Sequence, residues 1–411
     1  MNTVVALREP EPETRVALVP EVVTQLVRTG LRVVVQSGAG TLSLHSDDAY
    51  REAGAVVATG RELAEELGRA RVLAHVRPLD PVRIAALPPG MITIGLTGVV
   101  EPAGAPVPEP ASTAHHAPAA GPGPEPSGAP ASAPAHDAGG PAMIEALNAA
   151  RITTLSFEKL PRTSRAQAMD VLSSQSFTAG YRAVLEAAIR LPRFFPLAMT
   201  AAGTVPPAKV IVLGVGVAGL QAIATARRLG AKVAANDIRP ESAEEVRSVG
   251  ADFIDVGLTG AGTGGYARAL DTAASDTQQQ ILAGHIIDAD VLITTAAVPG
   301  RPAPRLVSAA TVAGMRPGSV VVDLAAATGG NVEGARPGVT HHLPSTRGGG
   351  DVTVVGVASA PSDLPVDASR LFARNVANVL AALTDEHGHL TANLEDDLIG
   401  GMCLTHAGRS R

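Results

Sequence analysis

The chain has 411 residues and a formal net charge of −6, and it contains no dense block of lysine and arginine. That charge excludes a protein built to neutralise nucleic-acid phosphates. Hydrophobic residues make up 45% of the chain but aromatic ones only 2%. The cores must therefore consist of Ala, Val, Leu and Ile, as in parallel sheets buried on both faces. At roughly 150 residues per domain, the length predicts two or three domains.

Signals for compartment and membrane are sparse. The one cysteine, Cys403, cannot form an intrachain disulfide or a cysteine-based zinc cage, which fits a reducing cytoplasm. The N-terminus MNTVVALREPEPETRV has no basic region followed by an apolar stretch, so we expect no signal peptide. The longest uncharged run, between Lys209 and Arg227, falls just short of the ~18 apolar residues of a membrane span and contains glycines. We therefore expect no direct membrane insertion, and any membrane role must come through a partner.

Short apolar runs alternate with helical stretches through the first hundred residues. This alternation is typical of a parallel sheet whose strands are connected by helices. Strands are predicted at residues 4–7, 31–36, 55–58, 72–76 and 91–96, and helices at 20–29, 47–53 and 61–69.

From residue 101 to 141 the composition changes to Pro, Ala, Gly and Ser, and eleven of the 32 prolines lie there. Such a stretch cannot bury enough apolar surface to offset its ordering entropy, so we predict a flexible insertion. His115, His116 and His136 within it are of a metal-ligating type. Solvated side chains in a disordered loop are the simpler interpretation, and we expect no metal site.

Regular elements are expected to return after the insertion, and Pro206 and Pro207 mark the start of a second α/β unit. Before these prolines we predict a helix at 142–150, a strand at 152–157 and a long helix from about 165 to 190. After them we predict strands at 209–214, 232–237, 252–256, 291–296, 320–324 and 353–357, with helices at 217–230 and 368–383.

The predicted fold class is α/β, with two Rossmann-like domains whose parallel sheets lie around a cleft and are joined by long helices. The N-terminal domain is expected to be discontinuous, comprising residues 1–164 with the insertion at 101–141, and residues 385–411. The second domain, which includes the connecting helices, is expected to span residues 165–384.

A glycine motif follows the first strand of the second unit. Gly214, Gly216 and Gly219 form G-x-G-x-x-G directly after the apolar run KVIVL and at the opening of a helix. The first glycine permits a tight turn, the second lets a pyrophosphate approach the backbone, and the third lets the helix pack close to the sheet. The helix N-terminus, at Val217 and Ala218, offers N–H groups and a positive dipole end to that pyrophosphate.

Asp237 ends the next strand, roughly 20 residues further on, where a carboxylate accepts hydrogen bonds from the adenosine ribose. It would also repel a 2′-phosphate, so the motif predicts NAD(H) rather than NADP(H) on this chain. Arg239 sits close by and complicates this preference. The alternative is a glycine-rich turn in a fold that binds no nucleotide.

Several other segments resemble one family. PETRVALVP, with Arg15, resembles the start shared by alanine dehydrogenases and the NAD(H)-binding subunits of transhydrogenases. PRTSRAQAMDVLSSQSFTAGYRAVLEAA, from Pro161 to Ala188, looks like the interdomain helix of transhydrogenases and the loop before it. GGYARAL, TTAAVPGRPAPRLV, MRPGSVVVDLAAATGGN and the tail LEDDLIGGMCLTHAG are also similar. The resemblance, which covers nearly everything outside the insertion, is to the alpha subunit (domain I) of proton-translocating NAD(P) transhydrogenases.

The resemblance implies catalytic residues beside the nicotinamide ring, where that family has an Arg–Gln–Asp loop. Its counterparts here are Arg162, Gln167 and Asp170. Arg162 and Asp170 would orient the carboxamide, which Ser173 would also contact, and Gln167 would reach toward the second nucleotide on another subunit. Tyr266 matches the tyrosine of a mobile loop that closes over bound nucleotide. Its loop is rich in glycine, which gives it freedom to move: Gly260, Gly262, Gly264 and Gly265.

The other expected cofactor contacts are Ile238, Arg239, Gly265, Ala296 and Leu324. Asp323 and Asn331 lie at the carboxyl end of a late strand and are expected to support the site only. Taken singly, Gln167 and Ser173 are ordinary surface residues and Tyr266 packs its own loop. Arg162 and Asp170 do not share an i, i+4 helical face, which disfavours a purely helical ion pair between them.

Two related activities differ in the chemistry that they need. Oxidising an amine or an alcohol releases a proton, so a dehydrogenase needs a general base, usually His or Lys. Hydride transfer between two nicotinamides needs no base, only two rings held close with water excluded. Alanine dehydrogenases carry a Lys and a His on the strands matching 72–76 and 91–96, where this chain has VLAHVRP and MITIGLTG. Only His75 stands nearby, and Arg15 alone cannot abstract a proton.

The expected function is hydride transfer from NADH on this chain to NADP⁺ on a partner, coupled to proton translocation. The resemblance implies a homodimer that docks on a membrane-spanning subunit and an NADP(H)-binding beta subunit, in the cytoplasm at the inner face of the cell membrane. The alternatives are an amino-acid dehydrogenase similar to alanine dehydrogenase, and a non-catalytic NAD(H) sensor.

Overall fold

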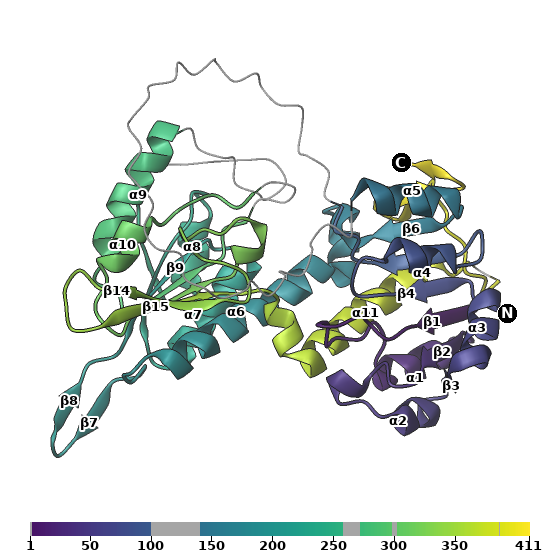
Figure 1. Cartoon of the computed structure of the whole chain (residues 1–411), viewed down its shortest axis with the longest axis horizontal. Helices are drawn as coiled ribbons and strands as arrows, with labels where there is room; N and C mark the ends of the chain where they lie inside the picture. The colour runs from purple at the N-terminus through teal and green to yellow at the C-terminus, as the bar shows by residue number, and fades with distance from the viewer. Residues whose placement is uncertain (1, 100–139, 258–271, 298–301, 386) are drawn as a thin grey trace, which may run out of the picture.

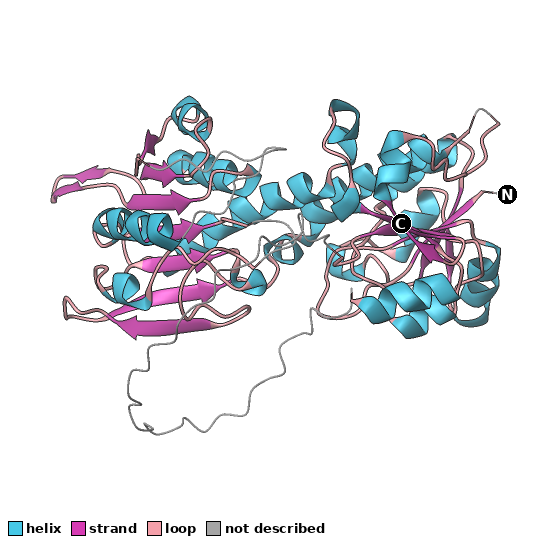
Figure 2. Ribbon diagram, turned by 90° about the horizontal axis from the view of Figure 1, so that it is seen from above, coloured by secondary structure: helices cyan, strands magenta, loops and turns pink. Residues whose placement is uncertain are grey.

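A computed structural model describes residues 2–99, 140–257, 272–297, 302–385 and 387–411. The chain folds into two α/β units, each built on its own sheet (Figure 1). Two long helices, α6 (Val171–Arg190) and α11 (Pro365–Leu383), lie side by side in the middle of the molecule, where the units meet (Figure 1 and Figure 2). The predicted α/β class with two Rossmann-like units is confirmed.

The first sheet has the strand order β17-β16-β6-β5-β4-β1-β2-β3, and its strands β1 to β6 are parallel. Alternate residues of β1 enter different cores, Val4 and Ala6 on one face and Val5 on the other, which is why its sequence is an unbroken apolar run. The strands are β1 (Thr3–Ala6), β2 (Arg32–Gln36), β3 (Val56–Ala58), β4 (Val72–Ala74), β5 (Ile92–Gly95), β6 (Thr153–Ser156), β16 (Cys403–His406) and β17 (Arg409–Ser410).

The helices of the first unit begin where polar residues or proline can close their first turns. Asp80 caps α4 and Asp396 caps α12 through side-chain oxygens, and Pro20 opens α1, which buries Val22, Val23 and Leu26. These helices are α1 (Pro20–Arg28), α2 (Asp47–Glu52), α3 (Gly60–Arg69), α4 (Pro81–Ala85), α5 (Pro141–Ala149) and α12 (Asp397–Met402).

The second sheet has the order β11-β10-β9-β12-β13-β15-β14, and only β14, at the edge, is antiparallel among its described strands. The order reverses between β9 and β12, so the crevice at their carboxyl ends is the point where such sheets bind ligands. The elements are β9 (Lys209–Leu213), α7 (Val217–Arg228), β10 (Lys232–Asn236), α8 (Ser242–Ser248), β11 (Asp252–Phe253), α9 (Thr272–Ile286), β12 (Val291–Thr294), α10 (Ala309–Ala313), β13 (Val320–Asp323), β14 (Thr340–Pro344) and β15 (Asp351–Gly356).

The two long helices serve different cores. α6 buries Ala183 and Val184 in the core of the second unit, whereas α11 buries Phe372 and Val376 in that of the first. The C-terminal tail also returns to the first unit, because β16 pairs with β6. The domain boundaries at 164 and 384 remain a proposal. Among the described helices, none is long and apolar enough to cross a membrane.

A small hairpin that the sequence analysis did not predict projects from the second unit (Figure 1). Its strands, β7 (Ala198–Thr200) and β8 (Gly203–Val205), pair with each other and with no other described strand. Met199 on β7 is 75% exposed. A two-stranded hairpin is marginally stable in water by itself, so these free edges and this apolar side chain are features that a partner surface would cover.

Candidate nucleotide-binding site

The glycine motif forms the turn between β9 and α7, and two of its glycines are there for backbone reasons. Gly214 has φ +90°, in the left-handed region, and a Cβ on it would lie 2.8 Å from the backbone nitrogen of Ala296. A Cβ on Gly219 would lie 1.9 Å from the carbonyl oxygen of Gly214. Both positions therefore require glycine if the helix is to stay this close to the sheet.

Gly216 differs, because a Cβ there would meet no described atom within 4 Å. It is the N-cap of α7, and no described side chain caps the helix, whose regular bonding starts at the N–H of Leu220 to the Gly216 carbonyl. The N–H groups of Val217, Ala218 and Gly219 therefore have no helical acceptor. An open backbone with unpaired donors at a helix N-terminus fits a pyrophosphate.

Asp237 follows β10 and faces this turn. Its Oδ2 accepts the Val215 N–H at 2.7 Å, and its Oδ1 accepts the Arg239 N–H at 2.9 Å. The Arg239 guanidinium returns to the same carboxylate and donates to the Val215 carbonyl at 3.0 Å. Burial alone would lower the pKa of Arg239, but the hydrogen bond and charge of Asp237, with Glu245 and Glu241, raise it. The predicted acidic residue is thus at the edge of the cradle and is linked to its backbone.

The far wall of the crevice is held by Asp323 and Asn331. Asp323 ends β13 and accepts hydrogen bonds from Thr294 Oγ1 at 3.0 Å and from the Val332 N–H at 3.0 Å. Burial raises the pKa of Asp323. Asn331 donates to the carbonyls of Ala296 and Pro304, both at 2.8 Å. These two side chains fix the loops after β12 and β13, which carry the expected cofactor contacts Ala296 and Leu324.

The residues expected beside the nicotinamide lie at the start of α6. Asp170 is the N-cap of that helix and accepts the N–H of Ser173 at 2.9 Å and its hydroxyl at 2.6 Å. Arg162 and Gln167 are exposed. The structure therefore brings Asp170 and Ser173 into contact, and it leaves the side chain of Gln167 at the surface, where a second subunit can reach it.

The long helix begins later than the sequence predicted, at Val171 and not near residue 165. Residues Ser164–Met169 form 3-10 turns, because Asp170 bonds to the backbone ahead of it and ends the earlier turns. Asn375 and Asn378 of α11 both donate to the Ala168 carbonyl, at 2.9 and 2.7 Å. These asparagines anchor the Gln167 segment, and nothing in the local sequence pointed to them.

Another residue that the sequence analysis missed is Gly180, in the middle of α6. A Cβ on it would lie 2.0 Å from the carbonyl oxygen of Ala218, in the first turn of α7. Only glycine allows α6 to cross α7 at this distance. Because α6 rises 1.5 Å per residue, Asp170 lies about 15 Å along the same helix. One rigid helix thus carries the Asp170–Ser173 pair and also contacts the pyrophosphate end of the cradle.

Several predictions fall outside the described residues. These are Tyr266 with Gly260, Gly262, Gly264 and Gly265, and the insertion histidines His115, His116 and His136. The roles proposed for the tyrosine loop therefore stay predictions.

The carboxyl ends of β1 and β4 hold buried polar groups. His75 is only 4% exposed, and its Nδ1 lies 2.7 Å from the Arg77 carbonyl. Burial lowers the pKa of His75 to about 4. Its ring fills the space beside Gly95, where a Cβ would lie 2.3 Å from the His75 Nδ1. Glu9 accepts the N–H groups of Val76 and Arg77, and burial raises the pKa of Glu9 to about 7.

Arg15 is buried as well and is already engaged. Its Nε and Nη2 each donate to Glu13 at 2.8 Å, and its Nη1 donates to Gln175 of α6 at 2.8 Å. Although burial alone would raise it, the pKa of Glu13 is lowered by the Arg15 guanidinium. Ser362, which follows the second sheet, donates to the same Glu13 carboxylate. Arg15 therefore helps to join the two units.

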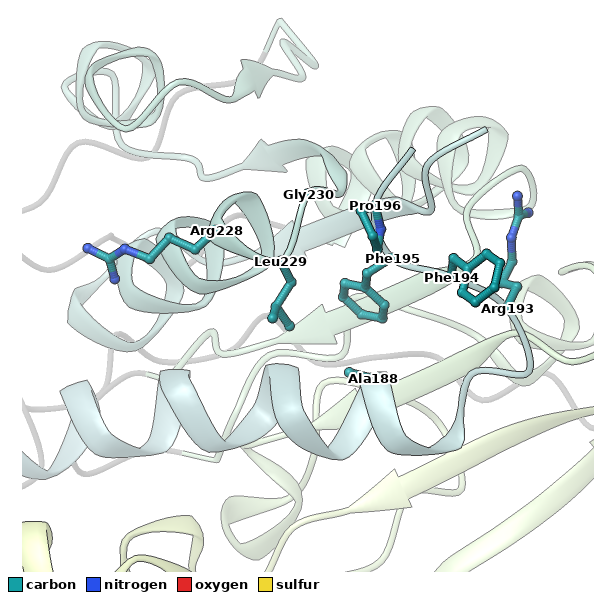
Figure 3. Close-up of a pocket in the computed structure, with 8 residues that line it drawn as sticks. All are labelled: Ala188, Arg193, Phe194, Phe195, Pro196, Arg228, Leu229 and Gly230. Carbon is teal, nitrogen blue, oxygen red and sulfur yellow. The ribbon is translucent and has the colours of Figure 1, made fainter. Parts of the chain in front are cut away.

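A hollow of about 580 Å³ lies elsewhere, at the carboxyl end of α7 (Figure 3). There the side chains of Leu229 and Phe195 point toward Ala188 of α6, with Phe194 beside them (Figure 3). The next strand begins at Lys232, so this hollow is at the amino edge of the sheet. It is therefore not the nucleotide site, which in parallel sheets lies at the carboxyl edge.

Two family models match the chain: "Alanine dehydrogenase/PNT, N-terminal domain" over residues 5–111 and "Alanine dehydrogenase/PNT, C-terminal domain" over residues 183–411. An NAD(P) transhydrogenase subunit alpha of Rhodospirillum rubrum is 40% identical, with 96% of this chain and 94% of that protein covered. A crystal structure of the transhydrogenase from Sinorhizobium meliloti has a TM-score of 0.80 and 38% identity, with 100% of both chains covered. The alanine dehydrogenase of Mycolicibacterium smegmatis is 27% identical, over 97% of this chain and 91% of that enzyme.

Proposed function

Because this chain belongs to the alanine dehydrogenase/PNT family, we propose that it is the NAD(H)-binding subunit of a Re/Si-specific, proton-translocating transhydrogenase. The observation that carries the proposal is a dinucleotide cradle with an acidic ribose position, in a chain whose relatives at 40% and 38% identity are named transhydrogenases. The 27% identity to an alanine dehydrogenase is the weaker likeness.

The reaction proposed is the transfer of a hydride from C4 of NADH on this chain to C4 of NADP⁺ on a partner subunit. NAD⁺ and NADPH are the products, and no proton is taken up or released in this step. When bound, NADH supplies the hydride. The chain's own residues hold the dinucleotide at the α7 N-terminus and at Asp237, fix the ring and keep water away.

Specific roles follow from the positions of the residues at the start of α6. Asp170 and Ser173 present a carboxylate and a hydroxyl together, a set that suits the nicotinamide carboxamide, and Arg162 is proposed to complete it. Gln167 is exposed and is proposed to reach the NADP(H) on the partner. Tyr266 is proposed to close over the bound nucleotide.

The buried groups at the ends of β1 and β4 fit amino-acid oxidation poorly. A general base must reach the substrate proton, and His75 is 4% exposed with its ring packed on Gly95. Arg15, the natural carboxylate ligand, is already bonded to Glu13 and Gln175. These contacts favour ring-to-ring transfer over an alanine-dehydrogenase-like activity.

The proposed assembly is a homodimer that docks on a membrane-spanning subunit and an NADP(H)-binding beta subunit, on the cytoplasmic face of the cell membrane. Support for the dimer comes from the β7–β8 hairpin and the apolar residues at its base. Phe194 is 59% exposed and Leu197 is 52% exposed, beside the hollow of Figure 3. An exposed arm next to an exposed apolar hollow on one surface suits a two-fold contact.

A pair of assays tests the proposal. The purified chain is incubated with NADH, pyruvate and ammonia, and separately with NADH, NADP⁺ and the NADP(H)-binding subunit. We expect turnover only in the second mixture. Replacing Gln167 with Asn should slow transfer there and leave the NADH dissociation constant unchanged, whereas Ser164→Ala, on the same 3-10 turn, should change neither. Robust turnover with pyruvate and ammonia would overturn the proposal, and a Gln167→Asn variant with full transfer would remove this residue's role.

A further inference from the structure

The loop after β10 contains both residue types by which Rossmann sites choose between cofactors. An acidic residue there accepts the 2′-hydroxyl of NAD, whereas an arginine nearby accommodates the 2′-phosphate of NADP. In this chain Asp237 and Arg239 occur two residues apart. Arg239 raises a question for the proposed function, on which this inference rests, because its cation would attract the wrong cofactor.

The geometry shows that the guanidinium of Arg239 is held against Asp237. Its Nε lies 3.2 Å from Asp237 Oδ1, and its Nη2 lies 3.0 Å from the Val215 carbonyl. The side chains are 14% and 9% exposed, so this pair is mostly removed from solvent. Arg239 is thereby bound to the same backbone turn whose N–H Asp237 accepts.

Two further carboxylates act on the same cation. Glu245 of α8 has its Oε2 3.9 Å from the Arg239 Nη2. Glu241, which directly precedes α8, also raises the pKa of Arg239 by its charge. Neither residue has a part in the proposed hydride transfer. The guanidinium thus has three carboxylates, of Asp237, Glu241 and Glu245, in its surroundings.

We propose that the chain rejects 2′-phosphorylated nucleotides through the combined charge of Asp237, Glu241 and Glu245, which outweighs a phosphate-binding cation, Arg239. A 2′-phosphate carries close to two negative charges at neutral pH. Placed beside Arg239 it would face three carboxylates, and it would have to compete with them for the guanidinium. The 2′-hydroxyl of NAD carries no charge and needs only the Asp237 oxygen.

This arrangement matters for the function proposed above. A subunit that delivers hydride to NADP⁺ must not bind NADPH in its own site, because the two nucleotides would then exchange hydride with no net conversion. Glu241 and Glu245 are the new specificity-determining residues, and Arg239 is the group through which they act.

The experiment measures the dissociation constants of NADPH and of NADH by calorimetry, on the full chain at low and high salt. We expect Glu241→Gln and Glu245→Gln each to tighten NADPH binding about fivefold at low salt, with a smaller effect at high salt. The double variant should gain roughly 20-fold, and NADH affinity should stay within about twofold of the parent. Glu244→Gln, one residue from Glu245 on α8, is the matched control and should leave both constants unchanged.

A third substitution tests the cation itself. Adding Arg239→Gln to the double variant should abolish the gain in NADPH affinity. The inference is wrong if the double variant binds NADPH no better than the parent, if Glu244→Gln gives an equal gain, or if the gain survives without Arg239. Failure of the parent chain to bind NADH would instead contradict the proposed function, so the two failures are distinguishable.

Discussion

Replacing Gly180 with Ala tests whether α6 sets the position of the nucleotide cradle. The new Cβ would lie 2.0 Å from the Ala218 carbonyl oxygen, far inside the ~3.5 Å of ordinary contact. The helices must then separate by more than about 1 Å, and overpacking of this kind costs ~1–3 kcal/mol. Ala218 lies in the first turn of α7, so the N–H groups that face the pyrophosphate move with it.

We expect Gly180→Ala to lower the free energy of unfolding by about 2 kcal/mol and to weaken NADH binding about tenfold, which is ~1.4 kcal/mol. Urea denaturation and calorimetry measure these two quantities. Gly284→Ala is the matched control, because Gly284 also lies inside a helix, α9, and a Cβ there would meet no described atom within 4 Å. That change should stabilise the protein by ~0.5–1 kcal/mol and leave NADH binding alone. A Gly180→Ala protein with parental stability and NADH affinity would refute the reasoning.

Three further predictions concern other positions. Gly216→Ala adds a methyl group where no described atom lies within 4 Å, so the unfolding free energy should change by less than about 0.5 kcal/mol while NADH binding weakens at least ~10-fold because the pyrophosphate is kept away; equal NADH affinity would contradict the cradle. Burial raises the pKa of Glu9 from 4.5 to about 7, so the folded protein binds the proton more tightly and stability falls as pH rises from about 4.5 to 7. Glu9→Gln should therefore gain on the parent across that window, by up to ~3 kcal/mol in urea unfolding, and a constant difference would contradict the assignment. Burial lowers the pKa of His75 from 6.5 to about 4, so its contribution has the opposite sign and His75→Gln should gain on the parent as pH falls from 6.5 to 4.

The parallel strands were predictable because their burial leaves a plain trace in the sequence. β9 and β12 are apolar runs, since each lies between two neighbours and under helices on both faces. The hairpin β7–β8 was missed because Ala198–Val205 is short, lacks strong strand formers and buries almost nothing. The antiparallel edge strand β14 was missed because its burial alternates, and two of its residues are histidines.

The candidate site divides in a similar way. Gly214, Gly219 and Asp237 were predictable since each answers to a local backbone need within one strand–turn–helix unit. Gly180 was not, because its need for a small residue arises only when α6 crosses α7. Asn375 meets the Ala168 carbonyl across about 200 residues of sequence, a distance over which no periodicity carries information.

The most direct test of the account follows the hydride itself. NADH carrying deuterium at the transferred C4 position is mixed with this chain, the NADP(H)-binding subunit and NADP⁺, and the products are analysed by mass spectrometry. The account predicts that the deuterium appears in NADPH without dilution by solvent, because the two rings meet with nothing between them. Deuterium recovered in an amino acid or a hydroxy acid, or lost to water, would contradict it.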